Sequence, residues 1–430
     1  MSALSATSAI SQIRASFPEQ GFFAEKEWVL SPEAFALDEK TVTLIRNLGP
    51  ALRAFQRTCN RLYFDETYPW VAKLLDQGKP QRVLDLGRNP RWHEDLPRVL
   101  RPDLVLTETG VTISELDSLP GGIGLAAWLN ETYAALDQDV IGGATGMIEG
   151  FAAAFPSEDI LISRESGDYL PEMSWLAEKL GRRVLRPWEV QPYELNGAAI
   201  YRFFELFDLA NVENADVMLR MAERGELGFT PPIKAFLEEK LWLALFWSPA
   251  LADFWQSALS ADHLELLHQC IPLGWVVDPV PLPPFAVWPK LDIQSWHEMK
   301  AFGGKQRQLV LKISGFSERG WGSRGVFIGH DLSQEQWGAA IDEAVASFPA
   351  NPFVLQEFHR ARVVTHPAWD EDKQATRAMQ SRVRLCPYYF ATSEEDDDPT
   401  LGGVLATVCP ADKKILHGMR DAMMLPCVAR

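Results

Sequence analysis

The chain has 430 residues, of which 47% are hydrophobic and 23% charged, and it contains 15 Trp and 23 Phe. This composition predicts a folded globular protein and excludes a disordered chain, because so many aromatic side chains need a core. The length predicts two or three lobes. The formal net charge of −17 argues against a nucleic-acid partner, since phosphate backbones require a basic surface.

The cysteines are few and scattered, and none forms a Cys-x-x-Cys pair: Cys59, Cys270, Cys386, Cys409 and Cys427. Such spacing is typical of reduced thiols in the cytosol. The first residues contain no continuous apolar core of a secretion signal. No stretch reaches the roughly 18 apolar residues of a membrane span. We therefore expect a cytoplasmic protein with no membrane partner, and the sequence leaves its oligomeric state open.

The first 80 residues are expected to be mainly helical, because apolar residues recur at helical spacing between 41 and 64. Residues 82–86 and the run around Asp103 are interpreted as short strands. A Glu-Thr-Gly turn then precedes a further strand over 111–117. Helices are predicted over 124–137 and 145–154.

A β-α-β order follows, with a strand from Asp159, a helix that ends at Gly181 and a strand from Arg183. This order predicts a small Rossmann-like lobe over about 155–200. From 201 to 270 the chain is expected to be largely helical. The Pro-rich segment 278–289 is interpreted as a connector, because proline is excluded from central strands.

The remaining third predicts strands, one amphipathic helix and a Gly-rich loop. The loop covers 314–325 and the helix covers 333–348. The strands are expected at 308–313, 326–329, 353–358, 381–391 and 401–409. The acidic loop between the last two strands is interpreted as a solvated turn.

An acidic pattern is the first candidate site. Glu115 and Asp117 are two apart in a strand, so their side chains point to the same face. Asp103 lies on the preceding strand, within reach across the turn. Three oxygen donors on one face suit Mg²⁺, and Arg101, also on that face, would stabilise the charge of a transferred phosphoryl group. The alternative is a pair of exposed acidic residues beside a turn.

The Gly-rich loop is the second candidate. Lys312 ends a strand, and the loop after it holds Gly320 and Gly322 together with Arg319 and Arg324. Glycine backbone N–H groups can surround phosphates while a lysine acts as a point charge. The two arginines add positive charge for catalysis. The alternative is an ordinary surface hairpin.

These patterns resemble the synthetase half of glutathionylspermidine synthase, an ATP-grasp enzyme. That family has Arg-x-Asp followed by Glu-x-Asn, and Arg101, Asp103, Glu115 and Asp117 match in type and order. Asp117 replaces the family's Asn, which keeps an oxygen ligand but adds charge. The acidic strands also precede the lysine and the loop, as in this permuted family. The resemblance extends from about 95 to 410 and implies Mg²⁺ beside ATP.

The resemblance also implies further nucleotide contacts. Lys240 matches a phosphate-binding lysine, although Glu239 stands where the family has Asn. Gln356 and Glu357 fall on the strand that reads adenine and ribose. The family's Lys-Pro is Lys-Ile here, at Lys312. The alternatives are a solvated lysine on a helix and an ordinary half-buried strand.

The expected fold class is α/β (α+β), ATP-grasp-like and multi-lobed, with a small Rossmann-like substrate lobe. Three regions are expected: a largely helical one over 1–95, metal-binding strands plus the Rossmann-like lobe over 96–200, and the nucleotide-binding lobes over 201–430. Arg382 and Arg384 share a strand face. Their role, and that of residues 413–421, is left open.

The function predicted from the resemblance is that of an ATP-dependent carboxylate–amine ligase. It would form an amide through an acylphosphate, with ATP and Mg²⁺ bound between lobes and residues 314–325 as a lid. The partners are a small-molecule carboxylate and an amine, whose identity the sequence does not give. The alternatives are a degenerate nucleotide-binding ATP-grasp protein without ligase activity and a small-molecule kinase on the same scaffold.

Overall fold

The computed structural model describes residues 5–19, 21–22, 28–283, 286–320, 324–414, 416 and 421–430. The chain forms two compact units. The first unit comprises Met1–Ala54, Glu94–Pro232 and Arg360–Arg430, and the second comprises Phe55–His93 and Ile233–His359. Each unit therefore combines segments that are distant in the sequence. The three consecutive regions expected from the sequence stay a prediction.

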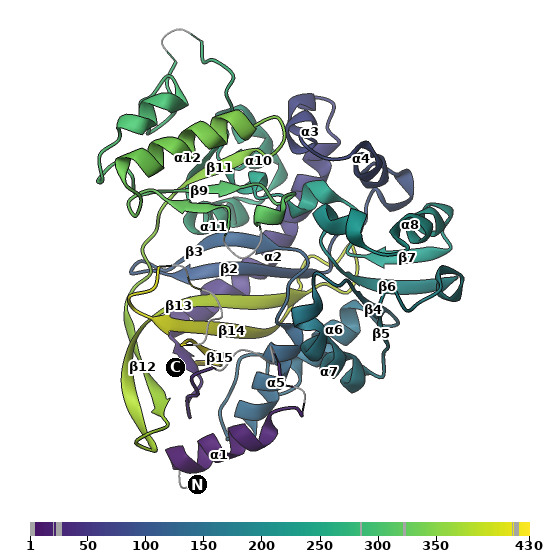
Figure 1. The fold of residues 1–430 in the computed structure, drawn as a ribbon, viewed down its shortest axis with the longest axis vertical. Coiled ribbons are helices and arrows are strands. Elements are labelled where there is room, and N and C mark those ends of the chain that lie inside the picture. Colours follow the sequence, from purple (N-terminus) through teal and green to yellow (C-terminus); the bar gives the residue numbers. More distant parts are fainter. Residues whose placement is uncertain are drawn as a thin grey trace. The chain divides into compact units, whose positions relative to one another are not determined.

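The first unit is built on a seven-stranded sheet of order β1-β15-β14-β13-β2-β3, with β12 paired to β13 (Figure 1). The strands are β1 (Phe35–Leu37), β2 (Val99–Leu106), β3 (Val111–Asp117), β12 (Val364–Asp370), β13 (Ala375–Phe390), β14 (Thr400–Pro410) and β15 (Met423–Ala429). Neighbours are antiparallel except for β1 and β15. The predicted hairpin around 103–117 and the predicted strand pair near 381–409 are confirmed.

Helices cover both faces of this sheet. Tyr389 and Phe390 are consecutive in β13 and therefore point to opposite faces. A Cβ on Gly49 would lie 2.6 Å from the Tyr389 ring, and a Cβ on Gly150 would lie 2.4 Å from the Phe390 ring, so glycine is required at both contacts. The helices of this unit that lie beside this sheet are α1 (Ala6–Ser16), α2 (Glu39–Tyr63, of which 39–54 belong here), α5 (Ile123–Ala134) and α6 (Gly146–Ala154).

A second, smaller sheet in the first unit is entirely parallel. Its order is β5-β4-β6-β7, with β4 (Asp159–Ile162), β5 (Val184–Leu185), β6 (Ala198–Phe203) and β7 (Leu227–Thr230). Helix α7 (Leu170–Leu180) connects β4 to β5 and ends at Gly181 in the left-handed conformation. The predicted Rossmann-like lobe is confirmed. It also continues through β6, η4 (Leu206–Asn211), α8 (Ala215–Arg224) and β7, where mainly helix was expected.

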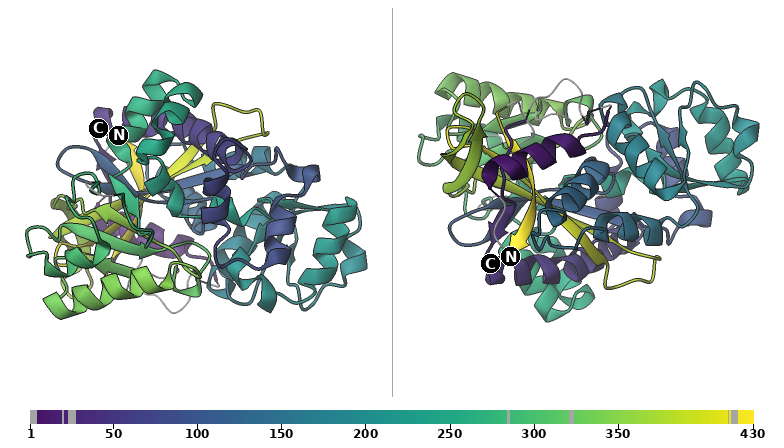
Figure 2. Two further views of the ribbon diagram at one scale, coloured as in Figure 1. Left: turned by 90° about the horizontal axis from the view of Figure 1, so that it is seen from above. Right: turned by 90° about the horizontal axis from the view of Figure 1, so that it is seen from below.

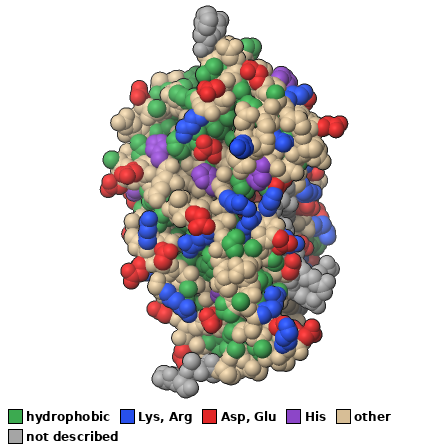
Figure 3. Space-filling view, turned by 90° about the vertical axis from the view of Figure 1, so that its left-hand side faces the viewer, with side chains coloured by type: hydrophobic (Ala, Val, Ile, Leu, Met, Phe, Trp, Pro, Cys, Tyr) green, Lys and Arg blue, Asp and Glu red, His purple; other side chains and the backbone are tan. Residues whose placement is uncertain are grey.

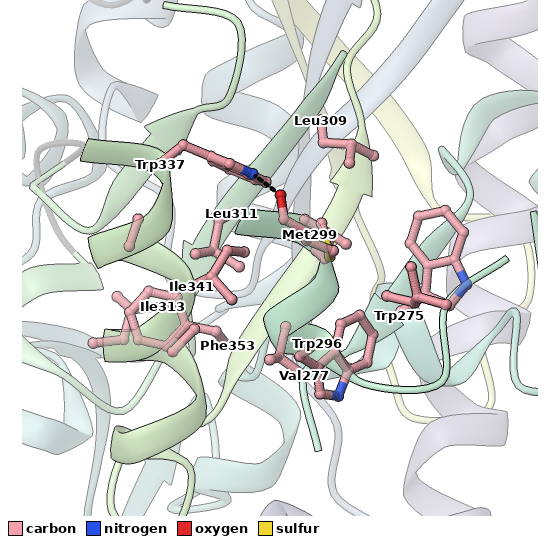
Figure 4. Packing of buried hydrophobic residues seen from close by; sticks show 14 residues of the cluster. Trp275, Val277, Trp296, Met299, Leu309, Leu311, Ile313, Trp337, Ile341 and Phe353 are labelled. Carbon is pink, nitrogen blue, oxygen red and sulfur yellow. Dashed lines mark hydrogen bonds between the residues drawn. The ribbon is translucent and has the colours of Figure 1, made fainter. Parts of the chain in front are cut away.

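The second unit contains a four-stranded antiparallel sheet of order β10-β9-β11-β8. Its strands are β8 (Gly274–Val276), β9 (Leu309–Ile313), β10 (Val326–Ile328) and β11 (Phe353–Glu357). Helix α12 (Gln334–Ser347) covers one face, as Figure 2 also shows. Trp337 and Ile341 of the helix pack there against Leu311, Ile313 and Phe353 (Figure 4). Strand alternation therefore turns Val310, Lys312, Val354 and Gln356 to the other face.

The second unit also contains the helices α3 (Pro69–Leu75), α4 (Gln81–Gly87), α9 (Leu241–Leu245), α10 (Ala252–Ala258) and α11 (Ala261–Cys270). The prediction of a strand over 82–86 is wrong, because this segment is α4. Val83 and Leu86 are buried three residues apart, and the Gln81 amide donates to Asp85 one turn on (2.8 Å). Both spacings are helical. In the described part of 278–289 no helix or strand forms, in agreement with the predicted connector.

Large apolar side chains lie mainly inside the units. On the face drawn in Figure 3, the described hydrophobic side chains are scattered among charged ones of both signs. Within the described ranges, no helix combines the length and the apolar character that a membrane span requires.

Candidate functional site

The structure brings the four acidic-motif residues together on one face of the β2–β3 hairpin. The register pairs Arg101 with Asp117 and Asp103 with Glu115, and side chains of paired residues share a face. The register shifts directly after Asp103, and the Ser114 hydroxyl donates to the Asp103 carbonyl oxygen (3.0 Å). This β-bulge places Asp103 opposite Glu115, so the carboxylates share one face up to the open end of the hairpin.

Two arginines bind the carboxylates of this face. The Arg101 guanidinium contacts Asp103 Oδ1 through Nε and Asp117 Oδ2 through Nη2, both at 3.0 Å. Its Nη1 donates to the Gly121 carbonyl oxygen at 2.9 Å. Arg384 on β13 contacts the other Asp103 oxygen, Oδ2, at 2.9 Å. Asp103 is only 5% exposed, and both of its oxygens are held by partly buried arginines.

These contacts set the ionisation of the cluster. Burial alone would raise the pKa of Asp103, but the Arg101 and Arg384 guanidinium groups outweigh it and lower that pKa. The pKa of Asp117 is raised, by burial and by the Glu115 charge, against the effect of Arg101. Burial alone would lower the pKa of Arg101, but the Asp103 and Asp117 carboxylates raise it.

Glu115 and Asp117 thus add two carboxylates to the face where the arginines hold Asp103. Oxygen donors on an electronegative strand face fit Mg²⁺. Within the described ranges, no three His, Cys, Asp or Glu side chains converge closely enough to enclose a metal ion by themselves. A Mg²⁺ there would draw its remaining ligands from water and from substrate phosphates, which is common for this ion. The metal role of Asp103, Glu115 and Asp117 stays a prediction.

The second candidate lies in the second unit, where the loop after β9 packs against the chain before α9. The Ser314 N–H donates to the Pro352 carbonyl oxygen (2.9 Å). A Cβ on Gly315 would lie 2.1 Å from the Glu238 carbonyl oxygen, so only glycine fits there. Gly320 ends the short helix η8 (Glu318–Gly320). Gly322 lies outside the described residues.

Lys240 reaches this loop from a distant part of the sequence. It stands at the start of α9, and its Nζ donates to the Gly320 carbonyl oxygen (3.2 Å). The two loop arginines have other partners. Arg319 forms an ion pair with Glu343, and Arg324 Nη2 donates to the Glu318 carbonyl oxygen at 2.9 Å. The structure thus brings Lys240 and the loop together, and their contact with phosphates stays a prediction.

Gln356 and Glu357 point to opposite faces of the sheet because they are consecutive in β11. Lys312 of β9 pairs with Val354 of β11. Gln356 lies two residues after Val354, so its side chain shares a face of the sheet with Lys312. Gln356 is 2% exposed. Its Nε2 and the Ser314 Oγ are buried with no hydrogen-bond partner among the described residues. Buried donors rarely lack partners, so these two groups can each bind water or a polar ligand.

The role of Arg384, which contacts Asp103 of the acidic cluster, was left open by the sequence. Its partner is Asp103 and not the acidic loop, whose Glu394 is bound by Arg98 at 3.0 Å. Arg382, two residues earlier, donates to the Lys413 carbonyl oxygen (3.3 Å). The spacing of the two arginines showed that they share a face, but not which face of the folded sheet.

Glu172 was not singled out in the sequence. It lies at the start of α7 and is 1% exposed. Its carboxylate accepts the N–H groups of Gly122 and Leu125 at the start of α5, at 2.7 and 2.8 Å. Burial raises its pKa to about 7, against these two bonds and the Arg101 charge. It titrates near neutral pH beside the acidic cluster.

This shift predicts a pH dependence of stability. The folded-state pKa lies above the ordinary glutamate pKa of 4.5, so between these two pH values the folded protein holds a proton that the unfolded chain has lost. Stability from Glu172 is complete below about pH 4.5 and is lost as the pH rises through about 7. At about 1.4 kcal/mol per pKa unit, the loss is on the order of 3 kcal/mol. Urea unfolding at pH 5 and pH 8 measures it. In Glu172→Gln the free energy of unfolding should differ less between the two pH values. An unchanged difference would contradict the raised pKa of Glu172.

Comparison with known proteins supports the fold. No family model and no curated protein matches the chain. Among solved structures, a glutathione synthetase-like effector from Globodera pallida in its apo form matches with a TM-score of 0.57 and 12% identity, over 98% of this chain and 95% of that chain. The two proteins share a fold. A putative gamma-glutamylcysteine synthetase from Methylobacillus flagellatus has a weaker likeness, with a TM-score of 0.41, 11% identity and 88% of each chain covered.

The predicted fold class is therefore confirmed: mixed α/β, of glutathione synthetase-like, ATP-grasp type. The narrower likeness to glutathionylspermidine synthase, carried by the acidic motif and the loop, stays a prediction.

Proposed function

We propose that this protein is an ATP-dependent carboxylate–amine ligase. The observation that carries the proposal is the arrangement in the second unit. There Lys240 meets the glycine loop at Gly320, and Ser314 and Gln356 offer buried donors without partners among the described residues. The fold shared with a glutathione synthetase-like protein supports the same reaction class.

Nucleotide binding is assigned to the second unit. Lys240 and Lys312 act as point charges toward phosphates, and loop N–H groups add hydrogen bonds. Gln356 donates to the purine edge, and Glu357, on the opposite sheet face, is proposed to contact the ribose from the strand end. Arg319 and Arg324 are proposed to leave Glu343 and the Glu318 carbonyl when they stabilise the transferred phosphoryl group.

Metal binding is assigned to the first unit. Glu115 and Asp117, with Asp103, would hold Mg²⁺, which neutralises phosphate charge when bound. Arg101 holds Asp103 and Asp117 in place through the two 3.0 Å contacts. Positioning of these oxygens, more than covalent chemistry by the protein, is the contribution of this face.

The proposed reaction has two steps. A substrate carboxylate oxygen attacks the γ-phosphorus of ATP, the bond to ADP breaks, and an acylphosphate forms. An amine nitrogen then attacks the acyl carbon, phosphate leaves, and the ammonium proton is lost to solvent. Both steps depend on oriented charges and exclusion of water.

Two other functions fit the same scaffold. Asp117 in place of Asn and Ile313 after Lys312 leave a degenerate nucleotide-binding protein and a small-molecule kinase as alternatives. ADP release, measured with amino acids and short peptides as acids and with primary amines, separates them. A ligase releases ADP in step with amide only when both acid and amine are present. ADP release with a single acceptor, or ATP binding without turnover in any pair, would overturn the proposal.

A further inference from the structure

A buried ion pair lies next to the glycine loop in the second unit. The Lys79 ammonium contacts Glu239 Oε1, and the two side chains are 2% and 1% exposed. Lys79 follows Gly78, whose φ of +72° lets the chain turn after α3. Its ammonium also donates to the Leu75 carbonyl oxygen at the end of α3. The cation is therefore fixed to a helix end, where it is stabilised.

The pair contacts the loop from two sides. Glu239 uses its second oxygen, Oε2, to accept the Gly315 N–H at 3.2 Å. The Lys79 Nζ lies 5.4 Å from the centre of the Phe316 ring, within range of a cation–π interaction. The first two glycine-loop residues after Ser314 are thus held by one ion pair.

Glu239 is also the residue directly before Lys240, whose Nζ holds the far end of the described loop at Gly320 (3.2 Å). An unpaired carboxylate at this position would repel a triphosphate at short range and in a buried setting. Lys79 neutralises that charge. The carboxylate can then accept the Gly315 N–H without weakening the attraction between the phosphates and the two lysines proposed to bind them, Lys240 and Lys312.

We propose that Lys79 and Glu239 are positioning residues for the phosphate-binding loop Ser314–Gly320, an inference that rests on the proposed function. Glu239 departs from the Asn that the resemblance leads one to expect, and Lys79 supplies the charge that this departure requires. The pair acts through the loop backbone. Neither residue is assigned a contact with the reacting atoms.

The test is a double-mutant cycle with Lys79→Met and Glu239→Gln. Each single variant leaves one buried charge without its partner. We expect each to raise the KM for ATP by about ten- to a hundredfold, the value of a charged hydrogen bond, with a smaller effect on kcat. The double variant buries no charge, and a glutamine oxygen still accepts the Gly315 N–H. It should recover most of the affinity.

Lys300→Met is the matched control, because it breaks an ion pair of the same unit, with Asp342, whose side chains are 43% and 48% exposed. Its KM should stay that of the wild type. A double variant no better than the single ones, or single variants with an unchanged KM, would overturn the proposal.

Hydrogen exchange of peptides covering Gly315 separates this inference from the proposed function, since it needs no turnover. Exchange should be faster in each single variant than in the wild type, slow again in the double variant and unchanged in Lys300→Met. If the wild type proves to ligate nothing, this pattern still tests the pair. If a single variant does not fold, fast exchange confined to this loop in the folded double variant would refute the coupling.

Discussion

Replacing Glu115 by glutamine is expected to lower ATP-dependent turnover by about 10²–10³-fold without unfolding the protein. The change removes a charge but keeps the shape. Glu115 is partly exposed and lies opposite Asp103 in the hairpin register, beside Asp117. Its proposed role is to bind Mg²⁺, which an amide does far less well than a carboxylate. Turnover at saturating ATP and Mg²⁺, with the melting temperature recorded in parallel, measures the effect.

Glu108→Gln is the control for this experiment. Glu108 is an exposed carboxylate in the turn of the same β2–β3 hairpin, and its loss should leave turnover unchanged. Binding of Mn²⁺, followed by its paramagnetic resonance, gives a readout that does not depend on the reaction. Wild-type turnover in Glu115→Gln, or unchanged Mn²⁺ affinity, would refute the metal assignment.

The local parts of the acidic cluster could be predicted from sequence. Strand-forming residues on both sides of the Glu-Thr-Gly turn, which the Thr107 N–H and the Gly110 carbonyl oxygen close (2.8 Å), favour a hairpin from local sequence alone. Once the hairpin exists, residues two apart share a face. The predicted grouping of Arg101 and Asp103 with Glu115 and Asp117 follows from this local geometry.

The partners from other strands could not be predicted in this way. Arg384 lies 281 residues from Asp103 along the chain, and Lys79 lies 160 residues from Glu239. Each contact depends on which segments pair or pack in the folded unit. A lysine after a Gly, or an arginine in a half-polar strand, carries no local sign of its partner.

Two errors or omissions in secondary structure have physical causes. Residues 82–86 are short and apolar, and a short apolar run does not separate helix from strand. Strand β12 and the first part of β13 were not predicted. Residues 375–378 are all exposed and show no apolar alternation, so their strand form comes from pairing with β12 and not from burial of one face.

Replacing Arg101 by methionine is expected to lower the free energy of unfolding by about 3 kcal/mol, the low end for breaking a buried ion pair. The guanidinium spans Asp103, Asp117 and the Gly121 carbonyl oxygen, and its side chain is 14% exposed. Asp103 keeps Arg384 in the variant. Asp117, whose side chain is 27% exposed, can recover some hydration, so the loss stays below the maximum.

Arg183→Met is the comparison variant for the loss expected in Arg101→Met. Arg183 pairs with Asp159 in the same unit, but its side chain is 65% exposed, and surface pairs contribute about 0–1 kcal/mol. Arg101→Lys should fall between the two, because an ammonium cannot span three acceptors in the fixed geometry of a guanidinium. Urea unfolding followed by tryptophan fluorescence ranks the variants. A loss in Arg101→Met no larger than in Arg183→Met would mean that the arginine does not hold the carboxylates together, and the cluster would then need another source of order.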